Sequence, residues 1–147
     1  MSNRRTPLPL PLVALHGRLP LVYAVNSDAE FLQIVADLLA DSQVTVALEQ
    51  MRPDIAATLA NLRRAHPSLL LLDVIPFRSE AERLLAAIEA DADLRRMAII
   101  LASTNPRSGE QVAAAYPQLV RAILPKPFSL DEFYETLSRY VAGIHKP

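Results

Sequence analysis

The sequence predicts an α/β domain built on a five-stranded parallel sheet. From Leu21 onward, short apolar runs alternate five times with helix-length amphipathic segments. Most of these runs are apolar at successive positions, which is typical of strands whose two faces are both covered. At this chain length the alternation favours a doubly wound, flavodoxin-like sheet with strand order 2-1-3-4-5 and helices on both faces.

The expected strands are runs of apolar residues, each bounded by polar residues, proline or a turn. They are residues 21–25, 44–48, 69–72, 98–101 and 119–124.

The expected helices are the segments in which apolar residues recur every three or four positions. The apolar stripes are Phe31, Ile34, Val35, Leu38 and Leu39 in the first helix, Ile55, Leu59 and Leu62 with the polar Thr58 in the second, Ala81, Leu84, Leu85 and Ile88 in the third, residues 110–115 in the fourth, and Leu130, Phe133, Leu137 and Val141 in the fifth.

A recurring Ser-x-x-Glu/Gln pattern indicates where helices begin, because both side chains can satisfy free backbone amides there. The pattern occurs at Ser27/Glu30, Ser79/Glu82, Ser108/Gln111 and Ser129/Glu132. The second helix lacks it, and we expect Pro53 in its first turn.

Composition narrows the function classes. The 147 residues carry 16 acidic and 15 basic side chains, and with +3 in the first 18 residues the remainder carries −4. This balance gives no basic stripe for nucleic acid or for an anionic membrane surface. The absence of cysteine excludes thiolate chemistry and Cys-ligated zinc, and it fits a cytoplasmic location. The three glycines cannot assemble a phosphate-binding loop.

The amino-terminal segment, residues 1–19, is expected to be a disordered proline-rich tail in front of one domain at 20–147. Arg4 and Arg5 before an apolar run resemble a secretion signal, but Pro7, Pro9 and Pro11 favour an extended conformation instead. No apolar run is long enough to span a bilayer, so no membrane contact is expected.

Polar residues of complementary chemistry follow three of the expected strands, and Asn26 and Ser27 follow the first. They are Asp73, then Ser103 with Thr104, then Lys126. Ligands of such sheets sit at the carboxyl ends of the strands. There, Asp73 is able to accept a phosphoryl group, while Lys126 and Ser103 stabilise the phosphoryl oxygens. A structural Asp73–Lys126 ion pair is the simpler alternative.

With these residues in place, the sequence resembles the receiver domain of bacterial response regulators from Pro20 to about Val141. The matching segments are residues 67–73, ending in Asp73, residues 97–103, ending in Ser103, and Leu124-Pro-Lys-Pro-Phe128. The resemblance implies phosphoryl transfer from a histidine kinase to Asp73, with Ser103 and Lys126 in the switch positions. It also implies a cis peptide bond between Lys126 and Pro127.

The sequence departs from the family at this site. The family's acidic pair, which holds Mg²⁺ together with the phospho-acceptor Asp73, matches Asn26 and Ser27 here. Neutral oxygens bind Mg²⁺ more weakly than carboxylates, so we expect at most weak binding and no other cofactor. Asp28 is a weak substitute, since it lies in the first turn of a helix.

Two further positions near the site differ from the family. Pro76 follows Asp73 one residue earlier than is usual, and no glycine comes after it. The position of the switching aromatic residue is Ile123. We therefore expect an atypical receiver in which the fold is kept and metal-dependent phosphorylation is weakened or lost.

The leading hypothesis is a non-enzymatic interaction module of phosphorelay signalling, whose partner is a histidine kinase or a downstream signalling protein. The alternative is a working phospho-acceptor that is phosphorylated at Asp73. A hydrolase has little support, because His16, His66 and His145 have no metal-ligand spacing. The fourth helix, fifth strand and fifth helix form the expected partner or homodimer face, since the last helix supplies more apolar and aromatic residues than one face must bury, namely Phe133, Tyr134, Leu137, Tyr140 and Val141. The favoured alternative is that Tyr134 and Tyr140 are ordinary half-buried side chains.

Overall fold

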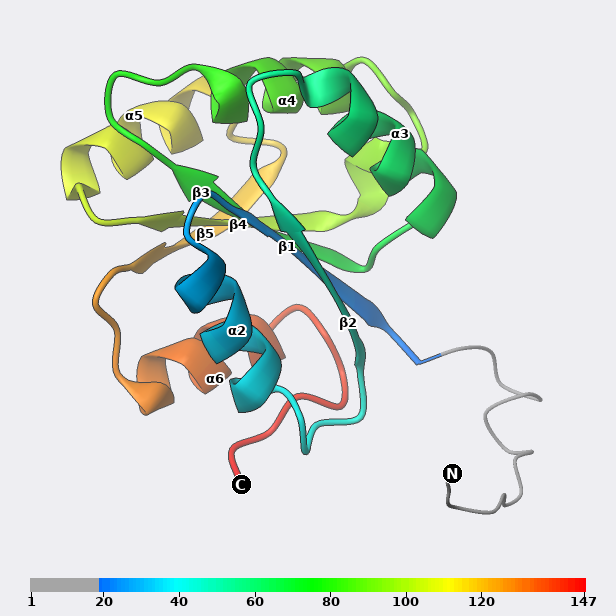
Figure 1. Ribbon diagram of the computed structural model, residues 1–147, viewed down its shortest axis with the longest axis vertical. Coiled ribbons are helices and arrows are strands. Elements are labelled where there is room, and N and C mark those ends of the chain that lie inside the picture. The colour runs from blue at the N-terminus through cyan, green and yellow to red at the C-terminus, as the bar shows by residue number, and fades with distance from the viewer. Residues whose placement is uncertain (1–18) are drawn as a thin grey trace.

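A computed structural model describes residues 19–147, so the expected tail lies outside the described residues apart from Leu19. The sheet is parallel in order β2-β1-β3-β4-β5, which confirms the predicted topology (Figure 1). Its strands are β1 (Leu21–Asn26), β2 (Thr45–Gln50), β3 (Leu69–Val74), β4 (Ala98–Ser103) and β5 (Val120–Pro125). The helices are α2 (Ala29–Leu38), α3 (Ile55–Ala65), α4 (Glu80–Glu89), α5 (Pro106–Ala115) and α6 (Leu130–Ser138), with the short 3-10 helix η1 (Leu94–Arg96) before β4.

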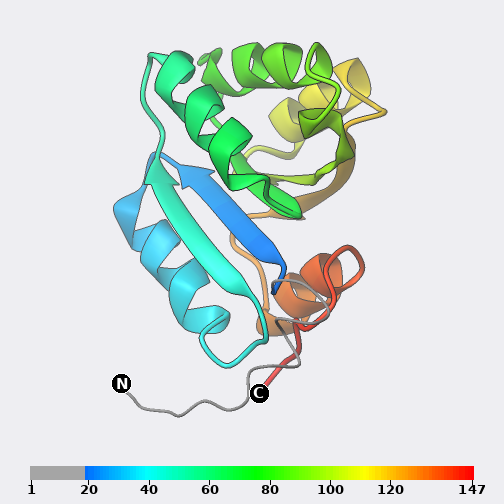
Figure 2. The ribbon, with the colours of Figure 1, turned by 90° about the vertical axis from the view of Figure 1, so that its right-hand side faces the viewer.

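The helices form two layers around the sheet. Helices α2 and α6 cover one face, and α3, α4 and α5 cover the other (Figure 1). Figure 2, turned by 90°, shows the same separation. Because β3 lies in the middle of the sheet, all six of its residues are buried. No helix among residues 19–147 is long and apolar enough to cross a membrane.

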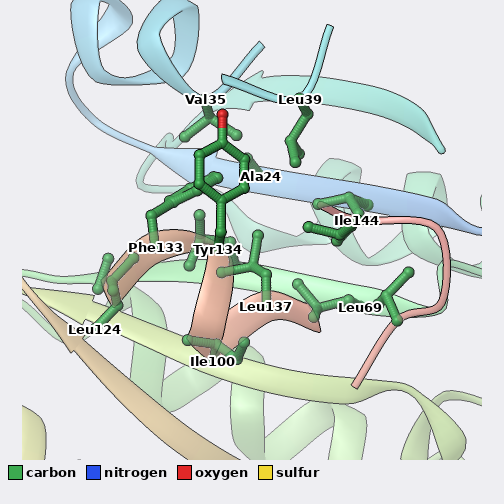
Figure 3. Close-up of a cluster of buried hydrophobic side chains, with 14 of the residues drawn as sticks. Ala24, Val35, Leu39, Leu69, Ile100, Leu124, Phe133, Tyr134, Leu137 and Ile144 are labelled. Carbon is green, nitrogen blue, oxygen red and sulfur yellow. The ribbon is translucent and has the colours of Figure 1, made fainter. Parts of the chain in front are cut away.

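The core under α6 is built from aromatic and branched side chains (Figure 3). Phe133 is fully buried, and Tyr134 is 5% exposed. The Tyr134 hydroxyl donates to the carbonyl of Leu38 at 2.6 Å, and Tyr140 donates to the carbonyl of Arg121 at 3.1 Å. Both hydroxyls therefore bond within the fold, which agrees with the favoured interpretation of Tyr134 and Tyr140 as ordinary packed side chains; Tyr140 is half-buried, and Tyr134 is buried more fully than expected.

The strands extend further at their carboxyl ends than the sequence predicted. Asn26, Asp73 and Ser103 all belong to strands, since their backbones still pair with the neighbouring strand while their side chains are polar. Strand β2 is an edge strand with three exposed and three half-buried residues, so it lacks the complete cover expected of most strands.

Only one of the four predicted capping boxes forms. Ser129 and Glu132 exchange both capping hydrogen bonds at the start of α6. At α2 the cap is Asp28, because Ser27 is drawn toward Asp73. At α5 the cap is Asn105, and Ser108 lies inside the helix.

At the remaining two helix starts, the structure again differs from the expected caps. Ser79 precedes α4 but makes no capping bond with its side chain. Helix α3 is capped by Asp54, which accepts from the amide of Ala56, so Pro53 lies just before the helix.

Two residues of the predicted apolar stripes are not in the core. Ile34 on α2 is 48% exposed, and Leu130 at the start of α6 is 52% exposed. Their helices are short and amphipathic, and the neighbouring positions Val35 and Phe133 already fill the space against the sheet. Apolar identity alone therefore mispredicted both positions.

A carboxylate on the edge strand fixes α3 to the sheet. Glu49 accepts hydrogen bonds from the hydroxyls of Tyr23 and Thr58 and, at 3.0 Å, from the amide of Asn61. This contact explains why the polar Thr58 lies on the otherwise apolar stripe of α3. Arg52 completes the charge balance, with 3.5 Å between its Nη2 and a Glu49 oxygen.

The pKa of Glu49 follows from these contacts. Burial raises it, but the hydrogen bonds from Thr58, Tyr23 and Asn61 outweigh burial and leave the pKa below its usual value. For Tyr23, burial together with the hydrogen bond to Glu49 raises the pKa. Glu49 is therefore ionised and Tyr23 neutral at neutral pH.

The two serines that precede α4 and α6 provide a matched test of capping. Ser129→Ala removes a bonded cap, so we expect a loss of about 1 kcal/mol in the free energy of unfolding. Ser79→Ala removes no capping bond, so we expect it to lower the free energy of unfolding by only a few tenths of a kcal/mol. Urea unfolding of both variants measures the difference, and equal losses would contradict the assignment of the caps.

Glu49→Gln is expected to destabilise the protein by about 1–3 kcal/mol at pH 7, because its new amide N–H groups face donors. The pKa of Glu49 is lowered on folding, so its stabilisation is complete above its ordinary pKa near 4.5. That stabilisation is lost as the pH falls toward the lower folded-state pKa. The gap between the wild type and the variant should thus narrow in acid, as measured by thermal unfolding across pH. A gap that stays constant would exclude this role for the carboxylate.

Candidate functional site

The candidate site lies where four strands end at the same edge of the sheet. Asn26 ends β1, and Ser103 ends β4. Asp73 is the penultimate residue of β3, and Lys126 directly follows β5. Parallel pairing places Asp73 opposite Ala102 on β4, one residue before Ser103. The structure therefore brings the predicted residues to one edge of the sheet.

Asp73 is the centre of the site. The residue is 4% exposed, and both of its carboxylate oxygens are engaged. Lys126 Nζ lies 3.2 Å from Oδ1. Ser27 approaches Oδ2 twice, with its backbone nitrogen at 3.4 Å and its Oγ at 3.2 Å. The buried negative charge is thus balanced by one ammonium group and by neutral donors of the protein itself.

The turn after β5 holds Lys126 in position. Its backbone N–H donates to the carbonyl of Ser103 at 2.8 Å, and the Lys126–Pro127 bond is cis, as the resemblance implied. Phe128 packs edge-on against Phe31, with 6.0 Å between ring centroids. The Lys126 ammonium lies 4.4 Å from the centroid of the Phe31 ring, a favourable arrangement for a cation.

Ser27 has a different role from the helix cap that its spacing suggested. Its hydroxyl points to Asp73, and Asp28 caps α2 by accepting from the amide of Glu30 at 2.9 Å. Gln50, at the end of β2, donates to the carbonyl of Ser27 at 2.9 Å. The Ser27 backbone is therefore tied to the neighbouring strand, which keeps its hydroxyl on the Asp73 carboxylate.

Asn26 is 1% exposed, and its side chain is only half satisfied. Its Oδ1 accepts the backbone N–H of Asp28 at 2.8 Å. Its Nδ2 has no hydrogen-bond partner among the described residues. The amide oxygen is thus committed to the loop, and the other end of the amide offers a donor, which cannot bind a cation.

Ser103 is also buried, and its hydroxyl is bonded away from Asp73. The Oγ donates to the carbonyl of Asn105 at 2.6 Å and accepts the N–H of the same residue at 3.1 Å. Gly109 packs against it so closely that a Cβ at that position would lie 3.3 Å from the Cβ of Ser103. The switch role that the resemblance implied for Ser103 stays a prediction.

These residues do not fit a divalent cation. Asp73 is the single carboxylate of the predicted metal trio, and Ser27 donates to one of its two oxygens. Asp28 is no replacement, because its carboxylate caps α2. Among residues 19–147 no three His, Cys, Asp or Glu side chains come together as a metal site. Magnesium, which proteins usually hold through one or two carboxylates together with water, would meet a single carboxylate here that is already bonded to Lys126 and Ser27.

The two described histidines lie away from Asp73. His66 ends α3 at the opposite end of β3, and the backbone N–H of His145 donates to Ser42 near the carboxyl terminus. Neither lies at the strand ends where a hydrolytic site would need a base. His16 falls outside the described residues.

Sequence reasoning noted the early Pro76 in the loop between β3 and α4 but missed the backbone conformation and exposure of Phe77 there. The N–H of Arg78 donates to the carbonyl of Ile75 at 3.1 Å, which closes a tight turn. Phe77 occupies this turn in the left-handed region, with φ of 64°, and its side chain is fully exposed. The early Pro76 was the available signal, since proline and a positive φ at the next residue together define a type II turn.

Neither a family model nor a curated protein matches the sequence. Solved structures do match. The chemotaxis response regulator CheY4 of Vibrio cholerae superimposes with a TM-score of 0.69 at 22% identity, over 84% of this chain and 99% of that one. A pilus assembly-related protein of Burkholderia pseudomallei matches with a TM-score of 0.62 at 23% identity, over 87% of this chain and 93% of its own.

A third structure is the receiver domain of a sensor histidine kinase from Pseudomonas aeruginosa, which holds a magnesium ion in its active-site cleft. It matches with a TM-score of 0.67 at 20% identity, over 83% of this chain and 97% of that one. The strand order, the cis bond after Lys126 and these superpositions agree. The chain therefore has the fold of the receiver domains of response regulators.

Proposed function

We propose that this chain is an atypical receiver domain of phosphorelay signalling that acts by binding proteins, with Mg²⁺-dependent phosphorylation of Asp73 weakened or lost. The observation that carries the proposal is the pair of contacts from Ser27 to Asp73 Oδ2. A serine stands where the family has a carboxylate, and it supplies donors instead of a metal ligand.

The loss of the family's acidic pair at Asn26 and Ser27 bears directly on the chemistry of phosphoryl transfer. As the phosphoryl group moves, negative charge spreads over its oxygens and has to be neutralised by fixed cations. Among the residues that the structure describes, Lys126 is the one cation bonded to Asp73. Its ammonium already balances the carboxylate, so little positive charge is left for an incoming phosphoryl group.

The same contacts favour a single state of the domain. Asp73 is held by Lys126 and Ser27 without any metal, and Ser103 is bonded to its own loop. A module of this kind presents one surface to its partner at all times. By the resemblance, that partner is a histidine kinase or a downstream signalling protein.

A second candidate function is a working phospho-acceptor, and one observation favours it. Asp73, Ser103 and Lys126 all occupy the expected strand ends, and the turn after Lys126 has the expected cis bond. The two candidates differ in whether Asp73 gains a phosphoryl group in the presence of Mg²⁺.

The first test restores the missing acids. Intact-protein mass is measured after incubation with a small-molecule phosphodonor and Mg²⁺ for the wild type and for Asn26→Asp/Ser27→Asp. We expect no adduct on the wild type and one phosphoryl group on the double variant, because two carboxylates restore the magnesium ligands. Adding Asp73→Asn should abolish the adduct. A phosphorylated wild type would establish the phospho-acceptor function and refute our proposal.

The second test concerns the Asp73–Lys126 pair. In a site with three clustered carboxylates, neutralising one of them relieves the repulsion between like charges. Here a single carboxylate, Asp73, is paired with a lysine, so neutralising it removes an attraction instead. Asp73→Asn and Lys126→Met are therefore each expected to destabilise the protein by about 3 kcal/mol, since each leaves a buried partner unpaired. The double variant should lose much less than the sum of the two. Urea unfolding of the four proteins measures this coupling, and additive losses or a stabilising Asp73→Asn would show that the pair does not hold the site.

A further inference from the structure

The backbone of Lys126 does not by itself determine where the Lys126 ammonium lies. The backbone N–H is bonded to the carbonyl of Ser103 at 2.8 Å, which anchors the start of the side chain. From there a flexible stem of four methylene groups carries the ammonium. The side chain is only 16% exposed, so water surrounds little of it. The protein groups that contact the ammonium therefore decide its position.

Two such groups lie against the ammonium from different elements. Asp73 Oδ1, on β3, is 3.2 Å from Nζ, and the centroid of the Phe31 ring, on α2, is 4.4 Å from it. An ammonium has three N–H groups, and among residues 19–147 Asp73 is the one hydrogen-bond acceptor that Lys126 Nζ finds. The face of an aromatic ring is negative and attracts a cation without needing a directed hydrogen bond. Phe31 thus attracts the part of the ammonium that Asp73 does not bind.

The Phe31 ring is held in place by other aromatic rings. Phe31 is 7% exposed, and Phe128 packs against it at an angle of 82° with 6.0 Å between centroids. Phe128 in turn stacks on the fully buried Phe133, with 5.4 Å between centroids. Core packing accounts for the burial of Phe31, but it does not require a lysine ammonium over the ring. The ring is therefore a fixed support for Lys126.

The loop after β1 supports both members of the ion pair. Ser27 in this loop donates to Asp73 Oδ2 through its backbone nitrogen and its hydroxyl. Asp28 then caps α2, and Phe31 lies in the first turn of that helix. One short segment of chain thus places a donor on the carboxylate and an aromatic ring on the ammonium.

We propose that Phe31 is a positioning residue that holds the Lys126 ammonium against Asp73. With the carboxylate on one side and the ring on another, the ammonium is kept at Oδ1 and away from the space that phosphoryl oxygens would occupy. Phe31 thereby contributes to the single state of the site, in addition to the missing acids at positions 26 and 27.

This role deepens the function proposed above and rests on it, because it acts on the same ion pair. The two are nevertheless tested by different measurements. The phosphodonor experiment reports whether Asp73 gains a phosphoryl group, whereas the position of Lys126 is read from the accessibility and the spectrum of its own side chain.

The chain contains two lysines, Lys126 and Lys146, which makes amine labelling a direct test. Lys146 is 52% exposed and reports the dose of reagent. After a brief exposure to acetic anhydride, the ratio of acetylation at Lys126 to that at Lys146 is measured by peptide mass spectrometry. Phe31→Leu is expected to raise this ratio about fivefold, because the ammonium loses its attraction to the ring. Phe31→Tyr keeps a ring and should label like the wild type.

Val35→Ala is the matched control. Val35 is fully buried one turn further along α2 in the same cluster, so its truncation loosens the helix without removing the ring. We expect no change in the labelling ratio for this variant. Urea unfolding establishes that each variant is folded. If Phe31→Leu does not fold, Phe31→Met takes its place, since an unbranched side chain fills irregular space.

Nuclear magnetic resonance provides a signature that altered stability alone does not produce. The Phe31 ring current should shift the ε-methylene protons of Lys126 upfield in the wild type and in Val35→Ala, and the shift should be absent in Phe31→Leu. Equal labelling of Lys126 in the wild type and in Phe31→Leu would overturn the proposal. So would an equal rise in Val35→Ala, which would show that loosening of α2 exposes the amine, or wild-type methylene protons without the upfield shift.

Discussion

A carboxylate at the end of the central strand of a buried sheet has to be balanced, and the pairing of Asp73 with Lys126 meets this constraint. The strand around Asp73 is buried at every position, so solvent cannot stabilise the charge. Lys126 reaches it from the turn after β5, and Ser27 reaches it from the loop after β1. The loop after β1 and the turn after β5 are therefore both fixed by one carboxylate, whose charge is balanced by donors within the chain.

The same principle organises the surface. Glu49 and Glu80 are buried acids, and each is paired with an arginine that projects into solvent. In each pair the carboxylate points inward and the guanidinium lies nearer the surface, so the buried acid is neutralised without being exposed to solvent. The acids of α2 have no such partners and stay in solvent.

The sequence was sufficient to predict the sheet and the Asp73–Lys126 contact, because strand periodicity and parallel order determine where the strand ends meet. It was not sufficient for Ser27, since both neighbours can cap α2 and only the tertiary contact with Asp73 decides between them. Ile34 was placed in the core for its apolar character, although Val35 already occupied that space. Pro76 signals a turn, but the left-handed backbone of Phe77 is one that its residue type disfavours, so its conformation and exposure were not predicted.

Only three residues separate Asp73 from Phe77, so the exposed turn lies directly beside the site in the chain. Arg78 is held first by Glu80, and Asp73 adds to the attraction, so both acids raise the pKa of Arg78. On the proposed function, the neutral Asn26 and Ser27 leave Asp73 paired with Lys126 at all times, so the charge beside this arginine stays constant and the domain presents one surface to its partner.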